Sequence, residues 1–416
     1  MHNSAKIALL LLSAALATVS VDAQSSASSS RHINTGMTAA PAAFNLATAG
    51  KPGCANSPTG GNCPESAPCC SHAGYCGSDA LFCGETCQPG GSFDPKDSCW
   101  PLPMSVNLHD EFKDPSRLVE ARDYNGFPDS ADWVVDYSLA KKPHAEITAD
   151  QKLVLKLNRH EPHPDTGGGI GATVHSSRWL HYGTIEARLK TAATGPGTVS
   201  SFILISSISG DEIDYEIVGK DPLDVQTNYY YRVQPGRPVD YTRSDSLYQE
   251  TDTSADYHDY KIEWTPTEMK WSIDGKFDKE HSRNVTKAEA GGSFPDTPMR
   301  VAFGLWDGGS FPNEGTSDWA GKNTSYAPNN EREYIMSVEW VKITPLNPEP
   351  AGEPWPGSKY LKRMEESDGG KGGSGGSGGP RVGRGKSGAT ALTSASSLAT
   401  AVFTASLAAF ASFVFA

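Results

Sequence analysis

Short runs in which apolar and polar residues alternate dominate the middle of the chain, from about position 100 to 346. These runs are rich in Val, Ile, Tyr, Trp and Thr, and Gly, Pro, Asn and Asp separate them. Alternation with a period of two, bounded by turn residues, predicts strands, and helical periodicity is nearly absent. The clearest predicted strands are 133–137, 153–157, 183–190, 260–264, 270–274 and 336–343. We therefore expect an all-β fold, an antiparallel β-sandwich.

One predicted strand carries an unusual density of charge, because Asp211, Glu212, Asp214 and Glu216 all lie within 210–219. In a strand, Glu212, Asp214 and Glu216 point to one face, and the apolar residues between them point to the other. An acidic edge that only discourages strand pairing is the alternative reading. The number of supporting motifs elsewhere in the chain favours a functional acidic row that faces a groove or water.

The two ends of the chain have the composition of targeting and linker segments. Residues 1–23 read as a secretory signal peptide and 24–51 as a Ser/Ala-rich stem. Residues 347–387 read as a Pro/Gly/Ser-rich tether, and 388–416 as the signal for a glycosylphosphatidylinositol (GPI) anchor, attached near Ser387 and removed on maturation.

A single C-terminal transmembrane helix is the alternative for the last apolar run. No Lys or Arg follows that run, so the anchor is favoured. We therefore expect a secreted protein, held at the plasma membrane by a GPI anchor, in the cell wall, or both.

All eight cysteines lie between Cys54 and Cys99, in a stretch with almost no aliphatic residues. Such a stretch cannot build a hydrophobic core, and in an exported chain it predicts a disulfide-rich module, here 52–99. A zinc site is the weaker alternative. Two sequons, at Asn284 and Asn323, predict exposed N-glycosylated loops.

The formal net charge of -13 argues against a nucleic-acid partner. No motif in the sequence calls for a metal or another cofactor, and we expect none.

The cysteine-rich stretch resembles the hevein-type chitin-binding module, carbohydrate-binding module family 18. The resemblance rests on the adjacent pair Cys69 and Cys70, followed by Ser71, Gly74, Cys76, Gly77 and an aromatic residue before Cys83. It implies the disulfide pairs Cys54–Cys70, Cys63–Cys76 and Cys69–Cys83, which leaves Cys87–Cys99 as the fourth.

In that family a serine hydroxyl and three aromatic rings hold N-acetylglucosamine, and the matching positions here are Ser71, Ala73, Tyr75 and Phe82. Ala73 removes one ring on which a sugar could stack, and Phe82 lacks the phenolic hydroxyl. Weak chitin binding and a purely structural cap both stay open.

The acidic row has the residues needed to cleave a glycosidic bond with retention of configuration. That chemistry needs two carboxyl groups about 5 to 5.5 Å apart, one a nucleophile and the other an acid and then a base. The Cα atoms of Glu212 and Glu216 lie roughly 13 Å apart along a strand, so these long side chains must lean toward each other over Asp214. Asp214 can orient the nucleophile and keep a neighbour protonated, since carboxylates that share a site raise one another's pKa.

The segment 211–216 resembles the active-site strand of glycoside hydrolase family 16, whose fold is a β-jelly roll. Supporting motifs occupy 182–190, 226–230, 258–264, 271–275, 306–309 and 318–321, so the resemblance extends over residues 100–346. It implies that Glu212 is the nucleophile, Asp214 the orienting acid and Glu216 the acid/base. The spacing without an inserted residue is that of the transglycosylating branches. Asp211 falls on the other face and is expected to be a structural ligand of a neighbouring turn or strand.

The order of segments is similar to that of the fungal Crh-type cell-wall transglycosylases, which join chitin to β-glucan. The resemblance implies chitin and β-glucan as partners, with a glucan hydroxyl replacing water as the acceptor. Candidate substrate-binding residues are Gln226, Asn228, Tyr230, His258, Trp306 and Trp319, each of which could instead pack in the core. For Trp264 and Trp271 we prefer the core.

Three departures put the choice of acceptor in doubt: Ile217, Asp307 and Lys322 stand where relatives commonly have other residues. Two alternatives remain. The chain could be an endo-β-glucan hydrolase of the wall, since the same carboxylates serve hydrolysis. It could also be an inactive wall-binding protein, against which the intact acidic row argues.

Overall fold

The computed structural model describes residues 53–136, 142–233, 243–283, 294–350, 354–357 and 359–362. The predicted signal peptide, stem, glycosylation site at Asn284, anchor site at Ser387 and anchor signal lie outside these residues, as does most of the predicted tether. Across the described segments, no helix is both long enough and apolar enough to cross a membrane.

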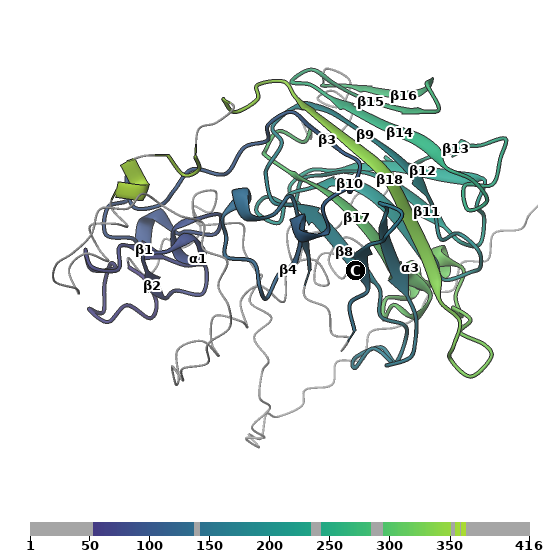
Figure 1. Cartoon of the computed structure of the whole chain (residues 1–416), viewed down its shortest axis with the longest axis horizontal. Coiled ribbons are helices and arrows are strands. Elements are labelled where there is room, and N and C mark those ends of the chain that lie inside the picture. The colour runs from purple at the N-terminus through teal and green to yellow at the C-terminus, as the bar shows by residue number, and fades with distance from the viewer. Residues whose placement is uncertain are drawn as a thin grey trace, which may run out of the picture. The chain divides into compact units, whose positions relative to one another are not determined.

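Two sheets form most of the structure (Figure 1). The first sheet contains, in spatial order, β13 (Asp245–Tyr248), β12 (Asp224–Tyr230), β11 (Glu212–Val218), β10 (Thr198–Ile205), β17 (Arg300–Asp307), β8 (Ala172–Ser176), β5 (Trp133–Val135) and β4 (Leu118–Glu120). The second contains β16 (Lys276–Ser282), β15 (Glu268–Ile273), β14 (His258–Trp264), β9 (Gly183–Lys190), β18 (Tyr334–Pro345), β7 (Leu153–Leu157) and β6 (Ala145–Ile147), with β3 (Leu108–Asp110) paired to β18. All these pairs are antiparallel except β4 with β5.

Helices are few and short in the described residues. They are α1 (Ala80–Cys83), α3 (Glu314–Ala320) and the 3-10 turns η2 (Pro89–Gly91), η3 (Pro115–Arg117), η4 (Pro128–Ser130) and η5 (Gly308–Ser310). This confirms the all-β prediction.

The core between the sheets is rich in stacked aromatic rings. Phe202 stacks on Phe303 with ring centroids 5.1 Å apart and on Tyr215 at 6.5 Å. Trp264 and Trp271 are fully buried, which confirms the preference for core packing at both positions. A ring of this size removes about 200 Å² from water, a gross gain of ~5 kcal/mol before conformational entropy is counted.

The strand predictions agree closely with the structure, and the differences have local causes. The predicted strands 153–157 and 183–190 match β7 and β9 residue for residue. The predicted strand 270–274 ends one residue early, because Asp274 and Gly275 both have positive φ, of 51° and 74°. Two successive residues of positive φ form the tight turn that joins β15 to β16.

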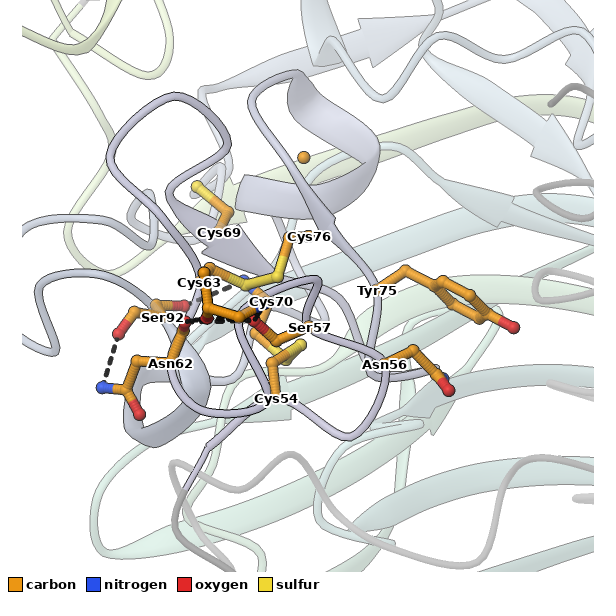
Figure 2. The surroundings of a disulfide bond; sticks show 12 residues. Cys54, Asn56, Ser57, Asn62, Cys63, Cys69, Cys70, Tyr75, Cys76 and Ser92 are labelled. Atoms are coloured by element: carbon orange, nitrogen blue, oxygen red, sulfur yellow. Dashed lines mark hydrogen bonds between the residues drawn. A yellow bond between two sulfur atoms is a disulfide. The ribbon is translucent and has the colours of Figure 1, made fainter.

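Four disulfides hold the small module at the start of the described chain. They join Cys54 to Cys70, Cys63 to Cys76, Cys69 to Cys83 and Cys87 to Cys99. All four predicted pairs are therefore confirmed. Figure 2 shows Cys54, Cys63, Cys69, Cys70 and Cys76 gathered in the middle of the module, while Tyr75 points away from them. No cysteine remains free, so these sulfurs cannot ligate zinc.

An aromatic cluster ties the module to later parts of the chain. Trp355 packs edge-on against Trp100, with centroids 5.4 Å apart, and against Phe127 at 5.9 Å. The indole N–H of Trp355 donates to the carbonyl oxygen of Pro101 at 2.9 Å. Trp355, in the predicted tether, is only 5% exposed and lies in one buried cluster with Cys69, Ala80 and Cys83 of the module.

A second link between the module and the jelly roll is ionic. The Glu85 carboxylate accepts a hydrogen bond from Arg300 on β17, and both side chains are largely buried. Ser207, in the turn that leads into β11, also donates to Glu85 at 3.4 Å.

Candidate active site

The acidic row lies on β11, in the middle of the first sheet. Ile213, Tyr215 and Ile217 face the core, and all three are at most 1% exposed. The Tyr215 hydroxyl donates to two carbonyl oxygens of the second sheet, at 3.0 and 3.1 Å, and so pins the strand across the sandwich. Glu212, Asp214 and Glu216 therefore point away from the core, as the period of two predicts.

Neighbouring strands place small and polar residues beside the row. On β12, Gln226, Asn228 and Tyr230 lie opposite Glu216, Asp214 and Glu212 respectively. On the other side, Ser201 of β10 lies opposite Glu216, and Gly304 of β17 lies opposite Ser201. A Cβ atom on Gly304 would come within 2.4 Å of the Ser201 hydroxyl, so a side chain at this position would force that hydroxyl to turn away. Nothing in the sequence pattern singled out Ser201 or Gly304.

The three carboxyl groups are nearly removed from water. Glu212, Asp214 and Glu216 are 5%, 1% and 8% exposed. Among the described residues, Oε2 of Glu212 and both carboxyl oxygens of Asp214 have no hydrogen-bond partner. Buried polar oxygens of this kind normally have hydrogen-bond partners, so these oxygens are available for hydrogen bonds to a substrate or to one another.

Burial controls the protonation of the row. It raises the pKa of Glu212 and Glu216 well above the ordinary value, and the charge of Asp214 raises both further. Burial likewise raises the pKa of Asp214 to about 7, against the opposing effects of the Asn228 main chain and the charge of Lys279. The three groups therefore share protons as one unit, and one of them can be ionised while its neighbours stay neutral.

Asp211, just before the strand, has the structural role expected from its parity. Its carboxylate accepts hydrogen bonds from the backbone N–H groups of Arg232, Asp296 and Thr297 and from the Thr297 hydroxyl, at 2.7 to 3.1 Å. It is fully buried. Asp211 thus fastens the start of β11 to two loops and takes no part in the row.

An aromatic pair lies near the Glu216 end of the row. Trp306 stacks on Trp319 of α3 with ring centroids 6.1 Å apart and an interplanar angle of 28°. The Trp319 indole donates to the side-chain oxygen of Gln226 at 2.8 Å, and Gln226 lies opposite Glu216 in the sheet. The structure therefore brings three predicted sugar-binding residues together, two of them half-buried rings.

The unusual Asp307 explains how that pair is held. Its carboxylate accepts hydrogen bonds from the backbone N–H groups of Gly169 and Ser310 and from the hydroxyls of Thr324 and Tyr326. This departure from the common pattern thus fixes the turn after Trp306 and leaves the acidic row untouched.

The other predicted substrate-binding residues are placed less uniformly. Tyr230 is 2% exposed and Asn228 6%, and the Asn228 side-chain oxygen already accepts from the backbone N–H of Tyr229. His258 does not join the site. It lies on β14 of the second sheet, where its ring nitrogens contact Asp274 at 2.7 Å and Thr251 at 3.3 Å. The predicted strand 260–264 forms the later part of β14, which begins at His258, and the topology puts β14 in the other sheet.

The predicted sugar-binding residues of the module are also unequal. Tyr75 is 42% exposed, and the hydroxyl of the buried Ser71 accepts from the Tyr75 backbone N–H at 3.2 Å. The Phe82 ring lies directly over Gly77 and packs against the cluster that contains Trp100. Phe82 therefore serves packing, which favours Tyr75 as the ring on which a sugar could stack.

Ligand atoms for a metal are scarce in the part of the chain that the structure describes. There, Cys54, Cys63 and Cys70 alone form a cluster of three close ligand atoms, and all three sulfurs are in disulfides. Asn323, the predicted glycosylation site that lies within the described residues, is exposed just after α3.

Comparison with known proteins gives a family match and several similar proteins. Residues 133–326 match the family model for glycosyl hydrolases family 16. The chain is 32% identical over 309 residues to Crh-like protein 3 of Botryotinia fuckeliana, covering 72% of this chain and 63% of that protein. It is 32% identical over 330 residues to the probable glycosidase CRR1 of Saccharomyces cerevisiae, covering 68% of this chain and 75% of that protein.

Among solved structures, a Crh5 transglycosylase in complex with NAG is similar, with 28% identity and a TM-score of 0.45. That match covers 60% of this chain and 88% of that chain. The chain spans less than two thirds of the length of the Botryotinia relative.

Proposed function

Because the chain belongs to glycosyl hydrolases family 16, alongside fungal Crh-like proteins, we propose that it is a retaining transglycosylase of the fungal cell wall. It cleaves chitin, keeps one part of the cut chain as a glycosyl-enzyme, and transfers that part to β-glucan. The observation that carries this proposal is the row of three buried carboxyl groups on one face of β11, with an aromatic pair beside it.

The two glutamates divide the chemistry in the first half-reaction. The Glu212 carboxylate attacks the anomeric carbon of the donor sugar, and a covalent glycosyl-enzyme forms. Glu216 gives its proton to the oxygen of the departing chain, so the glycosidic bond breaks without a free alkoxide. Burial and the negative charge on Glu212 keep Glu216 protonated for this step, because both raise its pKa.

Asp214 acts between the two glutamates. With its pKa raised to about 7, it is protonated in a mildly acidic wall and can donate a hydrogen bond to Glu212. A hydrogen bond of this kind favours the ionised form of the nucleophile. Asp214 thus holds the negative charge of the row on Glu212.

The second half-reaction decides between transfer and hydrolysis. Glu216, now ionised, takes the proton of an acceptor hydroxyl, whose oxygen attacks the anomeric carbon and displaces Glu212. Trp306 and Trp319 offer apolar ring faces on which an acceptor sugar can lie, and Gln226 is held by the Trp319 indole. An acceptor held in this way competes with water for the intermediate.

The remaining parts of the chain are consistent with work at the cell surface. We assign Tyr75 and Ser71 of the module to weak chitin binding, and the chain ends to export and GPI anchoring. Asn284 and Asn323 are the proposed glycosylation sites.

The test is product analysis with the purified protein, chitin oligomers and a fluorescently labelled β-glucan oligomer. A labelled hybrid of both sugars supports the proposal, and Glu212→Gln abolishes it. Labelled fragments without a hybrid identify an endo-β-glucan hydrolase instead. No change in any sugar identifies a wall-binding protein without activity.

A further inference from the structure

A buried lysine lies behind the acidic row, between the two sheets. Lys279 is on β16, opposite Trp271 of β15, and it is only 9% exposed. Its ammonium group donates to the carbonyl oxygen of Arg243 at 3.2 Å and to the Thr227 hydroxyl at 3.4 Å. Taking a charge out of water is costly, so a buried lysine needs an explanation in the charges around it.

The neighbours of Lys279 are the residues that support Asp214 from the core side. The ammonium lies over the ring of Trp271, 5.7 Å from its centroid, and the Trp271 indole donates to the backbone carbonyl of Asp214 at 3.0 Å. Thr227 immediately precedes Asn228, the residue opposite Asp214 in the sheet. Two independent contacts thus place the lysine behind the middle of the row.

The row itself needs a positive charge. It holds three buried carboxyl groups, and its free oxygens have no cationic partner on their own face among the described residues. We propose that Lys279 is a positioning residue that supplies this charge through the strand, and so allows the buried row to carry the negative charge of the nucleophile. The lowering of the Asp214 pKa by Lys279 agrees with this placement.

Other charged and titratable groups face Lys279, and a test must separate their effects from the effect of the Lys279 charge. Asp245 of β13 pairs with the ammonium at 3.4 Å, but its side chain is 60% exposed. Arg243 lies on the Tyr229 ring, 5.0 Å from its centroid. His281, two residues along β16, has its pKa lowered to about 4 by burial and then by the charge of Lys279, so it is neutral above that pH.

Removal of the charge should change how activity depends on pH. Sheets pack about 10 Å apart, and a unit charge at that distance with an effective dielectric constant of ~20 moves a titration by roughly one pH unit. Lys279→Met keeps the apolar stem and removes the charge. The acidic limb of its kcat/KM profile should move up by about one pH unit, with a roughly tenfold loss of kcat/KM below that limb and little change in KM.

Asp245→Asn gives the opposite perturbation. Both substitutions break the same ion pair, but this one removes the negative charge that partly cancels Lys279, so the acidic limb should move down. Lys279→Arg keeps the charge and should restore the wild-type profile. Lys270→Met is the control, because Lys270 on β15 pairs with Glu268 outside the core.

This proposal rests on the proposed glycosidase chemistry, so a second measurement is independent of turnover. Titration of the three carboxyl groups by ¹³C NMR should show the same opposite shifts without substrate. Equal profiles for wild type and Lys279→Met, or shifts of the same sign for Lys279→Met and Asp245→Asn, would overturn the role of Lys279. An enzyme without activity but with opposite NMR shifts would refute the proposed function alone.

Discussion

Asp214→Asn should make the protein more stable and less active, and the stability gain should depend on pH. Burial raises the pKa of Asp214 from 3.8 to about 7. The folded protein therefore binds this proton more tightly than the unfolded chain, and the folded state loses stability as the pH rises from about 4 to about 7. A rise of about three pH units at ~1.4 kcal/mol each makes the cost ~4 kcal/mol above pH 7.

The asparagine cannot ionise, so it does not incur that cost. The free energy of unfolding of the Asp214→Asn variant, measured with urea without reductant, should equal that of wild type near pH 4. It should exceed the wild-type value by ~4 kcal/mol near pH 8. Asp165→Asn, in an exposed loop, is the control and should show no such divergence. Activity of Asp214→Asn should fall by about a hundredfold or more, because the amide is a weaker hydrogen-bond donor to Glu212 than the protonated carboxyl group.

Two results would refute this reasoning. A difference in stability that is the same at both pH values would show that Asp214 does not titrate between them. A variant less stable than wild type at pH 8 would show that the ionised carboxylate stabilises the fold, so that burial does not dominate its energy.

Two further predictions follow from contacts outside the row. Trp319→Phe keeps a ring and removes the hydrogen bond to Gln226, worth about 1 kcal/mol, so the ratio of transfer to hydrolysis should fall about fivefold in product analysis by chromatography; an unchanged ratio would remove Trp319 from the acceptor site. Glu85→Ala leaves the buried Arg300 without its carboxylate, at a cost of about 3 kcal/mol, and should lower Tm by roughly 6 °C or more. Asp97→Asn, which breaks a surface ion pair, should change Tm by no more than about 1 °C, and an equal loss in both variants would contradict the argument.

The acidic row could be predicted from the sequence because the pattern that reveals it lies within one strand. A period of two separates Glu212, Asp214 and Glu216 from the apolar residues of the same strand, and the structure has this arrangement. The same local rule placed β7 and β9 to the residue. The same alternation was sufficient to exclude Asp211 from the row, since its carboxylate accepts hydrogen bonds from residues in two loops.

Contacts between distant segments could not be read in this way. His258 has the motif of a site residue, yet its strand belongs to the second sheet, and motif spacing does not report sheet membership. Trp355 lies in a Pro-rich stretch without periodicity, but it packs edge-on against Trp100. Lys279 lies in the mostly polar strand 276–282, where a lysine normally faces water, and only the packing of the sheets shows that it faces the core.

The glycosyl-enzyme offers the most direct test of the central claim, that Glu212 is the nucleophile of a retaining transfer. Glu216→Gln lacks the acid/base, so a donor with a good leaving group should load the enzyme and the intermediate should accumulate. Peptide mass spectrometry after rapid acid quench should then find one sugar chain on Glu212. A sugar on Asp214 or on another residue would contradict the account, as would rapid turnover by Glu216→Gln with no trapped intermediate.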